Sequence, residues 1–567
     1  MQTYGFITAS LLLSAGVLAQ QQVTVNLPSS SSNVKVPNHF HGFSMELTSM
    51  NEYFGSDENH RDPVFMQLLR NVRDRTGSLL LRVGGNSQDT AYPDENIQSA
   101  IEKTKVVAPR INSGATTFDV KVSKKLFDVM NGVSSATGAK WMYGLNFEDA
   151  KNMDSAKYLG QAAVETLGDH LFAIQIGNEP DLYAKHGVRT PDWGIPQYVD
   201  EWTSWASTLH EQFAPALKKQ DIFTGAVICC DWNVSDIMQS NFMSNGNNMN
   251  YLNSITVQKY SSNNCFGKAK GDYTDYLNHE WIIKNPKALY TESAKTINAA
   301  GKQLIMGETN TAACGGIPGV SDTFVSALWA VDWILYLASI GFSSVSLQIG
   351  GKTTLYNPMY NIDSAWEVAP IYYSSLAISE AVGKDKQAQF ENIDLGSSTL
   401  SSYGVFHDNS FKYAVLLNTD INQDATYILK GGWSSMPSEV KVKRLLASNY
   451  EEKNNITWGG QTFSGSFDGQ LKGDLQLETV KCDADSCTIK LPPTSVAFVG
   501  TDIDTVDPSS ILNESTNGVN NSTSAPAATG SNVVTGSSDA VPVSRKASIV
   551  FATALCGIVG AFLTNFM

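Results

Sequence analysis

Two glutamates stand where a pair of carboxyl groups could break a glycosidic bond. Glu179 follows an apolar run in Ile-Gln-Ile-Gly-Asn-Glu-Pro-Asp, and Glu308 follows another in Leu-Ile-Met-Gly-Glu-Thr-Asn. A carboxyl group at the exit of a buried strand lies at the rim of a pocket, where its surroundings can set its protonation state. Glycoside hydrolysis uses two such groups, one on each side of the scissile bond. The two segments therefore predict a retaining glycosidase.

The neighbours of the two glutamates suggest separate roles. We expect Glu179 to be the general acid/base and Glu308 the nucleophile. Asn178 directly precedes the acid and could hydrogen-bond the 2-hydroxyl of the sugar, a bond that strengthens in the transition state. Tyr260 is expected to donate a hydrogen bond to Glu308, and Arg82 to favour its ionised form through positive charge.

These residues need a scaffold, and the chain between about residues 38 and 350 predicts one. Apolar strand-like runs alternate there with longer helix-like stretches, which is typical of a parallel sheet wrapped by helices. Eight runs close a barrel, whose chemistry lies at the carboxyl ends of the strands. Glu179 follows the fourth run and Glu308 the seventh. The eight runs are residues 42–47, 79–83, 141–146, 172–177, 223–229, 255–260, 304–307 and 345–349.

Other polar residues occupy the same kind of position. Each by itself could cap a loop, but as a set at successive strand ends they favour substrate-binding or supporting roles. His39 and His41, at the entry of the first strand, are interpreted as structural. The additional strand-end candidates are Glu46, Asn86, Asn146 and Gln348.

The texture of the sequence changes after the barrel, which we place at residues 38–382. Short alternating runs separated by Gly, Asn, Asp and Pro predict an antiparallel β-sandwich over residues 383–501, with a supporting role. Residues 20–37 also alternate and are expected to join that sandwich. The predicted fold class is therefore α/β, a (β/α)8 TIM barrel followed by an antiparallel β-sandwich.

Both ends of the 567-residue chain are expected to be processed. Residues 1–19 are typical of a secretory signal peptide, and residues 502–540 form a Ser/Thr-rich stalk. Residues 541–567 match a signal for a glycolipid anchor, although the tail is also long enough for one transmembrane helix. Either interpretation predicts a secreted protein held at the cell surface.

Cysteines and sequons agree with secretion. Cys482 and Cys487 flank four residues and are expected to form a disulfide, while Cys229 or Cys230 could pair with Cys265; other connectivities stay open. Without a CxxC pair or an HExxH motif, we expect no metal and no cofactor. The net charge of −15 argues against nucleic-acid binding. It also disfavours a strongly anionic polymer as substrate, unless the pocket is locally basic. Candidate glycosylation sites are Asn233, Asn455, Asn513, Asn520 and Asn521.

Three segments resemble glycoside hydrolase family 79, which holds β-glucuronidases and heparanase-like enzymes. They are residues 41–46 (His-Gly-Phe-Ser-Met-Glu), 81–89 (Leu-Arg-Val-Gly-Gly-Asn-Ser-Gln-Asp) and 176–181 (Ile-Gly-Asn-Glu-Pro-Asp). The resemblance covers about residues 22–500 and implies a barrel with a C-terminal β-sandwich. It implies the same roles for Glu179 and Glu308, and implies that Glu46 and Asn178 bind sugar hydroxyls.

One departure from that family concerns the substrate. In its glucuronidases, a tyrosine and a glycine amide shortly after the nucleophile help to bind the substrate carboxylate, but residues 311–316 contain no tyrosine. Gly315 or Gly316 could supply the amide, and Tyr356 the phenol. The leading hypothesis is an exo-β-glucuronidase acting on glucuronic acid or its 4-O-methyl form. The alternatives are a retaining glycosidase for a neutral sugar, an endo-acting heparanase-like enzyme, and a catalytically silent, anchored wall protein that binds polysaccharide; the oligomeric state stays open.

Overall fold

The computed structural model describes residues 21–57, 61–104, 118–149, 153–362 and 365–503. All of them belong to one compact unit, Met1–Asn513. Within this part of the chain no helix has both the length and the apolar character needed to cross a membrane. Several predictions lie outside the described residues: the signal peptide, all but the first two residues of the stalk, the C-terminal anchor, and the sequons at Asn513, Asn520 and Asn521.

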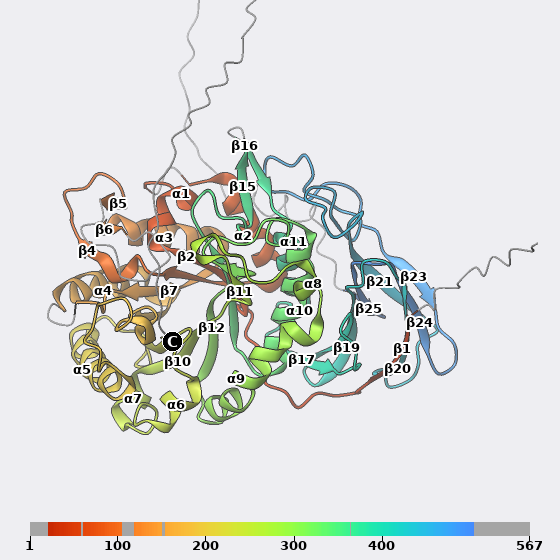
Figure 1. The fold of residues 1–567 in the computed structure, drawn as a ribbon, viewed down its shortest axis with the longest axis horizontal. Helices are drawn as coiled ribbons and strands as arrows, with labels where there is room; N and C mark the ends of the chain where they lie inside the picture. Colours follow the sequence, from red (N-terminus) through yellow and green to blue (C-terminus); the bar gives the residue numbers. More distant parts are fainter. Residues whose placement is uncertain (1–20, 58–60, 105–117, 150–152, 363–364, 504–567) are drawn as a thin grey trace, which may run out of the picture. The chain divides into compact units, whose positions relative to one another are not determined.

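Eight parallel strands close into a barrel, which confirms the predicted fold class (Figure 1). The barrel order starts at β2, passes through β3, β7, β8, β9, β10 and β12, and returns through β14 to β2. The strands are β2 (His41–Glu46), β3 (Leu79–Gly84), β7 (Ala139–Leu145), β8 (Leu171–Ile176), β9 (Phe223–Ile228), β10 (Leu252–Gln258), β12 (Gln303–Thr309) and β14 (Ser344–Ile349).

The barrel interior changes from apolar to polar toward the carboxyl ends of its strands. Leu80, Met142, Ala173 and Ile305 form one buried apolar cluster. Two residues further along β3 and β8, the same inward-facing positions carry Arg82 and Gln175, because side chains on one face of a strand repeat every second residue. The apolar layer closes the bottom of the barrel, and the polar layer above it forms the floor of a site.

Helices follow the strands and cover the barrel (Figure 1). Asp62 caps the first long helix by accepting hydrogen bonds from the Val64 and Phe65 N–H groups, both at 2.9 Å. The helices of five or more residues are α1 (Met50–Phe54), α2 (Pro63–Thr76), α3 (Lys125–Thr137), α4 (Asp154–Leu167), α5 (Ile195–Phe213), α6 (Val234–Gln239), α7 (Gly246–Tyr251), α9 (His279–Ala299), α10 (Phe324–Ser339) and α11 (Tyr372–Val382); α8 (Tyr273–Tyr276) is one turn.

The C-terminal strands form two sheets. One has the order β1-β20-β24, and the other runs β17-β18-β19-β25-β21-β22, with β23 also paired to β21. All of these pairs are antiparallel except β1 with β20, which is parallel. The strands are β1 (Gln21–Leu27), β17 (Ala388–Ile393), β18 (Leu400–His407), β19 (Ser410–Asn418), β20 (Ala425–Gly431), β21 (Glu439–Leu446), β22 (Thr457–Trp458), β23 (Glu478–Lys481), β24 (Cys487–Leu491) and β25 (Ser495–Gly500).

The remaining strands of the described residues form small sheets in the loops of the barrel. These are the pairs β11–β13 and β15–β16 and the three-stranded sheet β4-β6-β5. They are β4 (Ala91–Pro93), β5 (Ile101–Thr104), β6 (Asp119–Val122), β11 (Ser262–Asn263), β13 (Ala312–Ala313), β15 (Met359–Ile362) and β16 (Ala365–Val368).

The disulfides differ from one of the expected pairings. Cys482 is bonded to Cys487, but Cys230 does not reach Cys265: Cys229 is bonded to Cys230, and Cys265 to Cys314. The cause is local, because β11 pairs with β13 and brings the residues that follow each strand together.

Asn233 and Asn455 are exposed, and their glycosylation stays a prediction.

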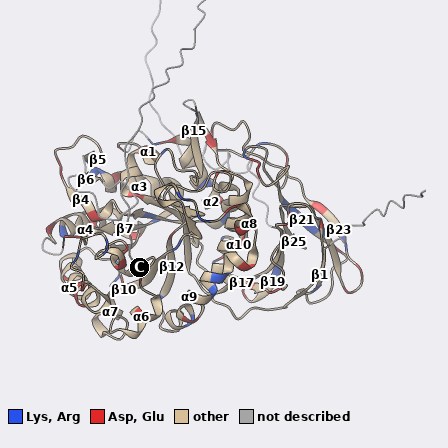
Figure 2. Cartoon of the chain, viewed as in Figure 1, with Lys and Arg blue, Asp and Glu red and all other residues tan. Residues whose placement is uncertain are grey.

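Charges of both signs are interspersed along the ribbon, most of which is uncharged (Figure 2).

A buried ionic cluster joins α2, α11 and β21. Glu380 accepts from Arg75 Nε at 2.9 Å and from Lys443 Nζ at 2.7 Å, and each of the three side chains is at most 3% exposed. Burial alone would raise the pKa of Glu380, but the charges of Lys443 and Arg75 outweigh it and hold that pKa below its usual value.

Replacing Glu380 with Gln should destabilise the protein by about 3 kcal/mol or more, because it leaves two buried cations without their anion. The matched control is Glu478→Gln, which breaks the more exposed pair with Arg444 and should cost less than about 1 kcal/mol. Urea unfolding at several pH values measures both. The folded-state pKa of Glu380 is lowered, so its contribution is present at neutral pH and is lost as the pH falls through that pKa. Equal costs for both variants would contradict the prediction.

Candidate active site

Glu308 lies on β12 at the mouth of the barrel and is held by two donors. Arg82 Nη1 donates to its Oε2 at 2.6 Å, and Tyr260 Oη donates to its Oε1 at 2.7 Å. Its side chain is only 10% exposed. Burial, followed by the charge of Glu308, raises the pKa of Tyr260 well above its usual value, so the phenol keeps its proton. A carboxylate with both oxygens fixed in this way is suited to attack on a sugar.

Glu179 follows β8 in a left-handed backbone conformation, with φ 49° and ψ 52°. Its N–H donates to the Val227 carbonyl at the end of β9, at 3.0 Å. Such a backbone is uncommon for a residue with a side chain and persists only where the surroundings impose it. The observed conformation sets the direction of the carboxyl group and supports a functional role for this residue.

A chain of amides connects the two glutamates. Asn178 Oδ1 accepts from Arg82 Nη2 at 2.7 Å and from Gln258 Nε2 at 2.8 Å. With its amide turned over, Gln258 donates to Glu179 Oε1 at 2.8 Å and accepts from Arg82 Nη2 at 2.9 Å, which satisfies both ends of the amide. Gln258 therefore lies between Asn178 and Glu179.

The environment of Glu179 favours its protonated form. Burial raises the pKa of Glu179 well above its usual value, and the negative charges of Glu308 and Asp181 add to that effect. Two carboxyl groups whose surroundings differ in this way can divide the roles of acid and nucleophile. The division of roles between Glu179 and Glu308 stays a prediction from the sequence.

Glu46, at the end of β2, forms part of the same site. Its carboxylate accepts from the Asn86 and Ser87 N–H groups at 3.2 and 3.1 Å and from Ser87 Oγ at 2.6 Å. Burial and then the charge of Glu308 raise the pKa of Glu46. The loop after β3 therefore fixes the orientation of this side chain, and Asn86 contributes to Glu46 through its backbone.

The loops after β10, β12 and β14 are tied together beside Glu308. The Tyr356 and Tyr260 rings lie 6.2 Å apart, and the Cys265–Cys314 disulfide links the loops that follow β10 and β12. Burial raises the pKa of Tyr356, as do the charges of Glu308 and Glu46, so this phenol also keeps its proton. The Leu355 N–H donates to Gly315 O at 2.9 Å, which brings the loop of Tyr356 onto the loop of Gly315.

The remaining predicted residues have different surroundings. Gln348 is buried on β14, and its Oε1 has no hydrogen-bond partner among the described residues. Asn146 instead serves its own loop: Nδ2 donates to Ala91 O at 3.2 Å, and Oδ1 accepts from the Glu148 N–H at 3.0 Å. Asn146 also lines a cavity of about 400 Å³ at the barrel mouth. Its polar groups hold the loop, and no contact joins it to the two glutamates in the described residues.

The sequence reading missed several contributors to the site. Ser44 Oγ and Gln175 Oε1 accept from Arg82 at 3.1 and 3.2 Å, and Gln258 contacts the acid. Each lies on a predicted strand, and its position on the inward face was the available signal. Asp181 belongs to the same motif as Glu179, and its carboxylate accepts hydrogen bonds from the Cys230 and Asp231 N–H groups. In the described ranges, no group of three or more His, Cys, Asp or Glu side chains could hold a metal ion.

Known proteins resemble this chain over most of its length. The model of the glycosyl hydrolase family 79 C-terminal beta domain matches residues 402–498. A β-glucuronidase of Neurospora crassa is 26% identical over 490 residues, covering 75% of this chain and 85% of that protein. A β-glucuronidase of Aspergillus niger is 24% identical over 491 residues, covering 78% and 86%. The matched domain and the two relatives support membership of glycoside hydrolase family 79, and the chain is a glycosidase.

Solved structures share the fold of this family 79 hydrolase. A 4-O-α-L-rhamnosyl-β-D-glucuronidase from Fusarium oxysporum aligns with a TM-score of 0.70 at 19% identity, covering 84% of this chain and all of that one. A GH51 arabinofuranosidase from Xanthomonas axonopodis pv. citri aligns with a TM-score of 0.56 at 11% identity, covering 85% and 99%. At these identities the likeness concerns the fold alone.

Changing Tyr260 to Phe removes one of the two donors to Glu308 and should lower kcat/KM by roughly 10- to 100-fold, the value of a hydrogen bond to a buried charged group. Steady-state rates on an aryl glycoside measure this loss. The control is Tyr92→Phe, an exposed tyrosine at the barrel mouth, which should keep its rate. If the two variants were equally active, Tyr260 would not support Glu308.

Proposed function

We propose that this family 79 hydrolase is an exo-acting, retaining β-glucuronidase that removes terminal glucuronic acid, or its 4-O-methyl form, from polysaccharide or proteoglycan side chains. The observation that carries the proposal is the pair formed by Glu179, which follows strand β8, and Glu308 on strand β12, connected through Arg82, Asn178 and Gln258. The β-glucuronidase names of the two fungal relatives support the choice of sugar.

In the first step of this mechanism, Glu179 gives its proton to the glycosidic oxygen while Glu308 attacks the anomeric carbon. The bond to the leaving group breaks, and an ester between Glu308 and the sugar forms. Glu179 is then ionised and removes a proton from water, whose oxygen displaces Glu308 and regenerates both side chains. Arg82 and Tyr260 stabilise the carboxylate that Glu308 regains.

The substrate carboxylate needs donors, and two lie close to Glu308. Tyr356 keeps its phenolic proton, and its ring stands beside that of Tyr260. The Gly316 N–H already donates to Ala312 O at 3.1 Å, so the Gly315 N–H is the better candidate for the amide donor. A Cβ added at Gly315 would meet no atom within 4 Å, so its backbone has room for a ligand. Together these two groups would replace the tyrosine that the loop after β12 lacks.

Initial rates of the purified protein on 4-nitrophenyl β-glucuronide test the reaction and both roles. Glu308→Ala should abolish turnover, because it removes the nucleophile. Glu179→Gln should slow substrates with poor leaving groups far more than activated aryl glycosides, because only the former need the proton. The surface variant Glu280→Gln should keep wild-type rates.

The outcomes separate the alternatives. Glucuronide hydrolysis that survives Glu308→Ala would refute the nucleophile assignment, and equal losses on both leaving groups would refute the acid assignment. Faster hydrolysis of the matched β-glucoside would favour a neutral sugar. Inactivity on both aryl substrates, with cleavage of an internal polysaccharide bond, would favour endo action; inactivity on polymers as well would favour a silent binder.

Tyr356→Phe tests recognition of the uronic acid. It should lower the ratio of glucuronide to glucoside kcat/KM by roughly 10-fold or more, because a hydrogen bond to a charged group is lost for one substrate only. Rates of the wild type and the variant on the two 4-nitrophenyl glycosides give that ratio. An unchanged ratio in a folded variant would assign carboxylate binding to other residues.

A further inference from the structure

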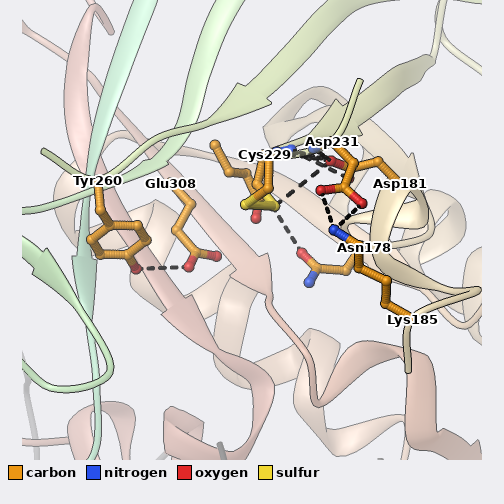
Figure 3. Close-up of a disulfide and its surroundings, with 9 residues drawn as sticks. Asn178, Asp181, Lys185, Cys229, Asp231, Tyr260 and Glu308 are labelled. Atoms are coloured by element: carbon orange, nitrogen blue, oxygen red, sulfur yellow. Dashed lines mark hydrogen bonds and ion pairs between the residues drawn. A yellow bond between two sulfur atoms is a disulfide. The ribbon is translucent and has the colours of Figure 1, made fainter. Parts of the chain in front are cut away.

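Two adjacent cysteines form a turn directly after β9, beside the loop that carries Glu179. Cys229 and Cys230 are bonded to each other, with their Cα atoms 3.7 Å apart. Three consecutive N–H groups of this turn point at one carboxylate, that of Asp181: Cys230 and Asp231 donate to Oδ2 at 2.8 and 2.9 Å, and Cys229 donates at 3.3 Å. Figure 3 shows this turn against Asp181, with Glu308 and Tyr260 in the same view.

A second contact joins the same two loops. The Glu179 N–H donates to the carbonyl of Val227, and both Val227 and Ala226 have left-handed backbones, with φ of 51° and 66°. The loop after β8 and the end of β9 are therefore linked twice within a few residues, once through the backbone of Glu179 and once through the carboxylate of Asp181. A bond between adjacent cysteine side chains restricts the peptide between them, so the N–H groups keep their shared direction.

We propose that Asp181 and the Cys229–Cys230 turn together form a positioning device for Glu179, in which the turn holds Asp181 as an anion and that anion favours the protonated, acid form of Glu179. This inference rests on the proposed role of Glu179 as the acid/base. Asp181 and both cysteines are positioning residues, since they act on the substrate through Glu179.

The negative charge of Asp181 determines the direction in which the pKa of Glu179 shifts. Burial raises the pKa of Asp181, and the three N–H donors of the turn oppose that shift by stabilising the anion. The charge of Asp181 in turn raises the pKa of Glu179. Without the turn, Asp181 would take up a proton more readily and its influence on Glu179 would fade. The other titratable groups that face Glu179 are Glu308 on β12, Arg82 on β3, Glu46 on β2 and Tyr260 after β10, and Lys259 faces Asp181.

The turn that holds the Asp181 carboxylate is itself anchored. Lys185 Nζ pairs with Asp231 Oδ2 at 2.6 Å, which anchors the far side of the turn to the segment that follows Glu179. No side-chain cation lies within ion-pair distance of Asp181 in the described residues, and its hydrogen bonds come from the backbone N–H groups of the turn. A carboxylate held by dipoles keeps its negative charge and can act on its neighbour.

The experiment measures the alkaline limb of the kcat/KM profile, which reports the acid in the free enzyme. The variants are Asp181→Asn and the double change Cys229→Ser/Cys230→Ser, and the control is Cys482→Ser/Cys487→Ser, which removes a disulfide in the β-sheet region. Both test variants should move the limb to lower pH by about half a unit or more, and the control should not. Combining the two test changes should shift the limb no further than Asp181→Asn alone, because they remove the same charge.

Two results would overturn the inference: a limb that stays in place in folded Asp181→Asn, or shifts that add in the combined variant. A merely structural role would lower kcat at every pH without moving the limb. Infrared difference titration of the Glu179 carboxyl, assigned with Glu179→Gln, gives the same answer without turnover. Failure of the proposed function, seen as an inactive wild type, is thereby distinguished from failure of this inference. Cys229→Ala/Cys230→Ala replaces the serine pair if that pair does not fold.

Discussion

The site depends on one buried cation. Arg82 is fully buried on β3, and its guanidinium contacts Glu308 on β12, Ser44 on β2, Gln175 on β8 and Asn178 directly after β8, so its partners come from three other strands of the barrel. A charge in this position is costly unless every donor has a partner. The partners are therefore as constrained as Arg82 itself, and the closed barrel is what brings them to one level. The same interactions that satisfy Arg82 hold Glu308 and Asn178, the residue before Glu179.

The strands of the barrel could be read from the sequence because they are buried on both faces and appear as continuous apolar runs. Glu179 and Glu308 were found in the same way, from their places at the ends of such runs. The polar layer beneath them was harder: Gln175 and Gln258 look like ordinary strand residues until the closure of the barrel fixes which face points inward. Asn146 shows the reverse error, since a strand-end position predicts a location and not which partner the side chain will choose.

The partner and direction of a strand pairing between distant segments do not follow from local pattern. Residues 20–37 are expected to join the C-terminal sheets, but the pattern does not predict that β1 lies parallel to β20, 404 positions away. Likewise, Cys265 reaches Cys314 only because β11 and β13 pair. Helix α10 is apolar on all sides and buried along its length, with Tyr403 of β18 donating to its Asp332 at 2.5 Å. A helix that is apolar on all sides is expected to be buried on all sides, but its sequence does not say which part of the chain covers it. Strand β18 of the C-terminal sheets provides part of this cover.

The carboxyl groups themselves explain why a proton belongs in this site. Glu46, Glu179 and Glu308 lie near a single guanidinium, and burial makes three negative charges around one positive charge unfavourable. Glu308 accepts from Arg82 and Tyr260, and Glu46 accepts from the two N–H groups and the hydroxyl of its loop, so both are supplied with donors. Glu179 contacts the Gln258 amide, and burial together with the charges of Glu308 and Asp181 raises its pKa well above the usual value. The proton therefore resides most favourably on Glu179, where the cleavage of a glycosidic bond requires it.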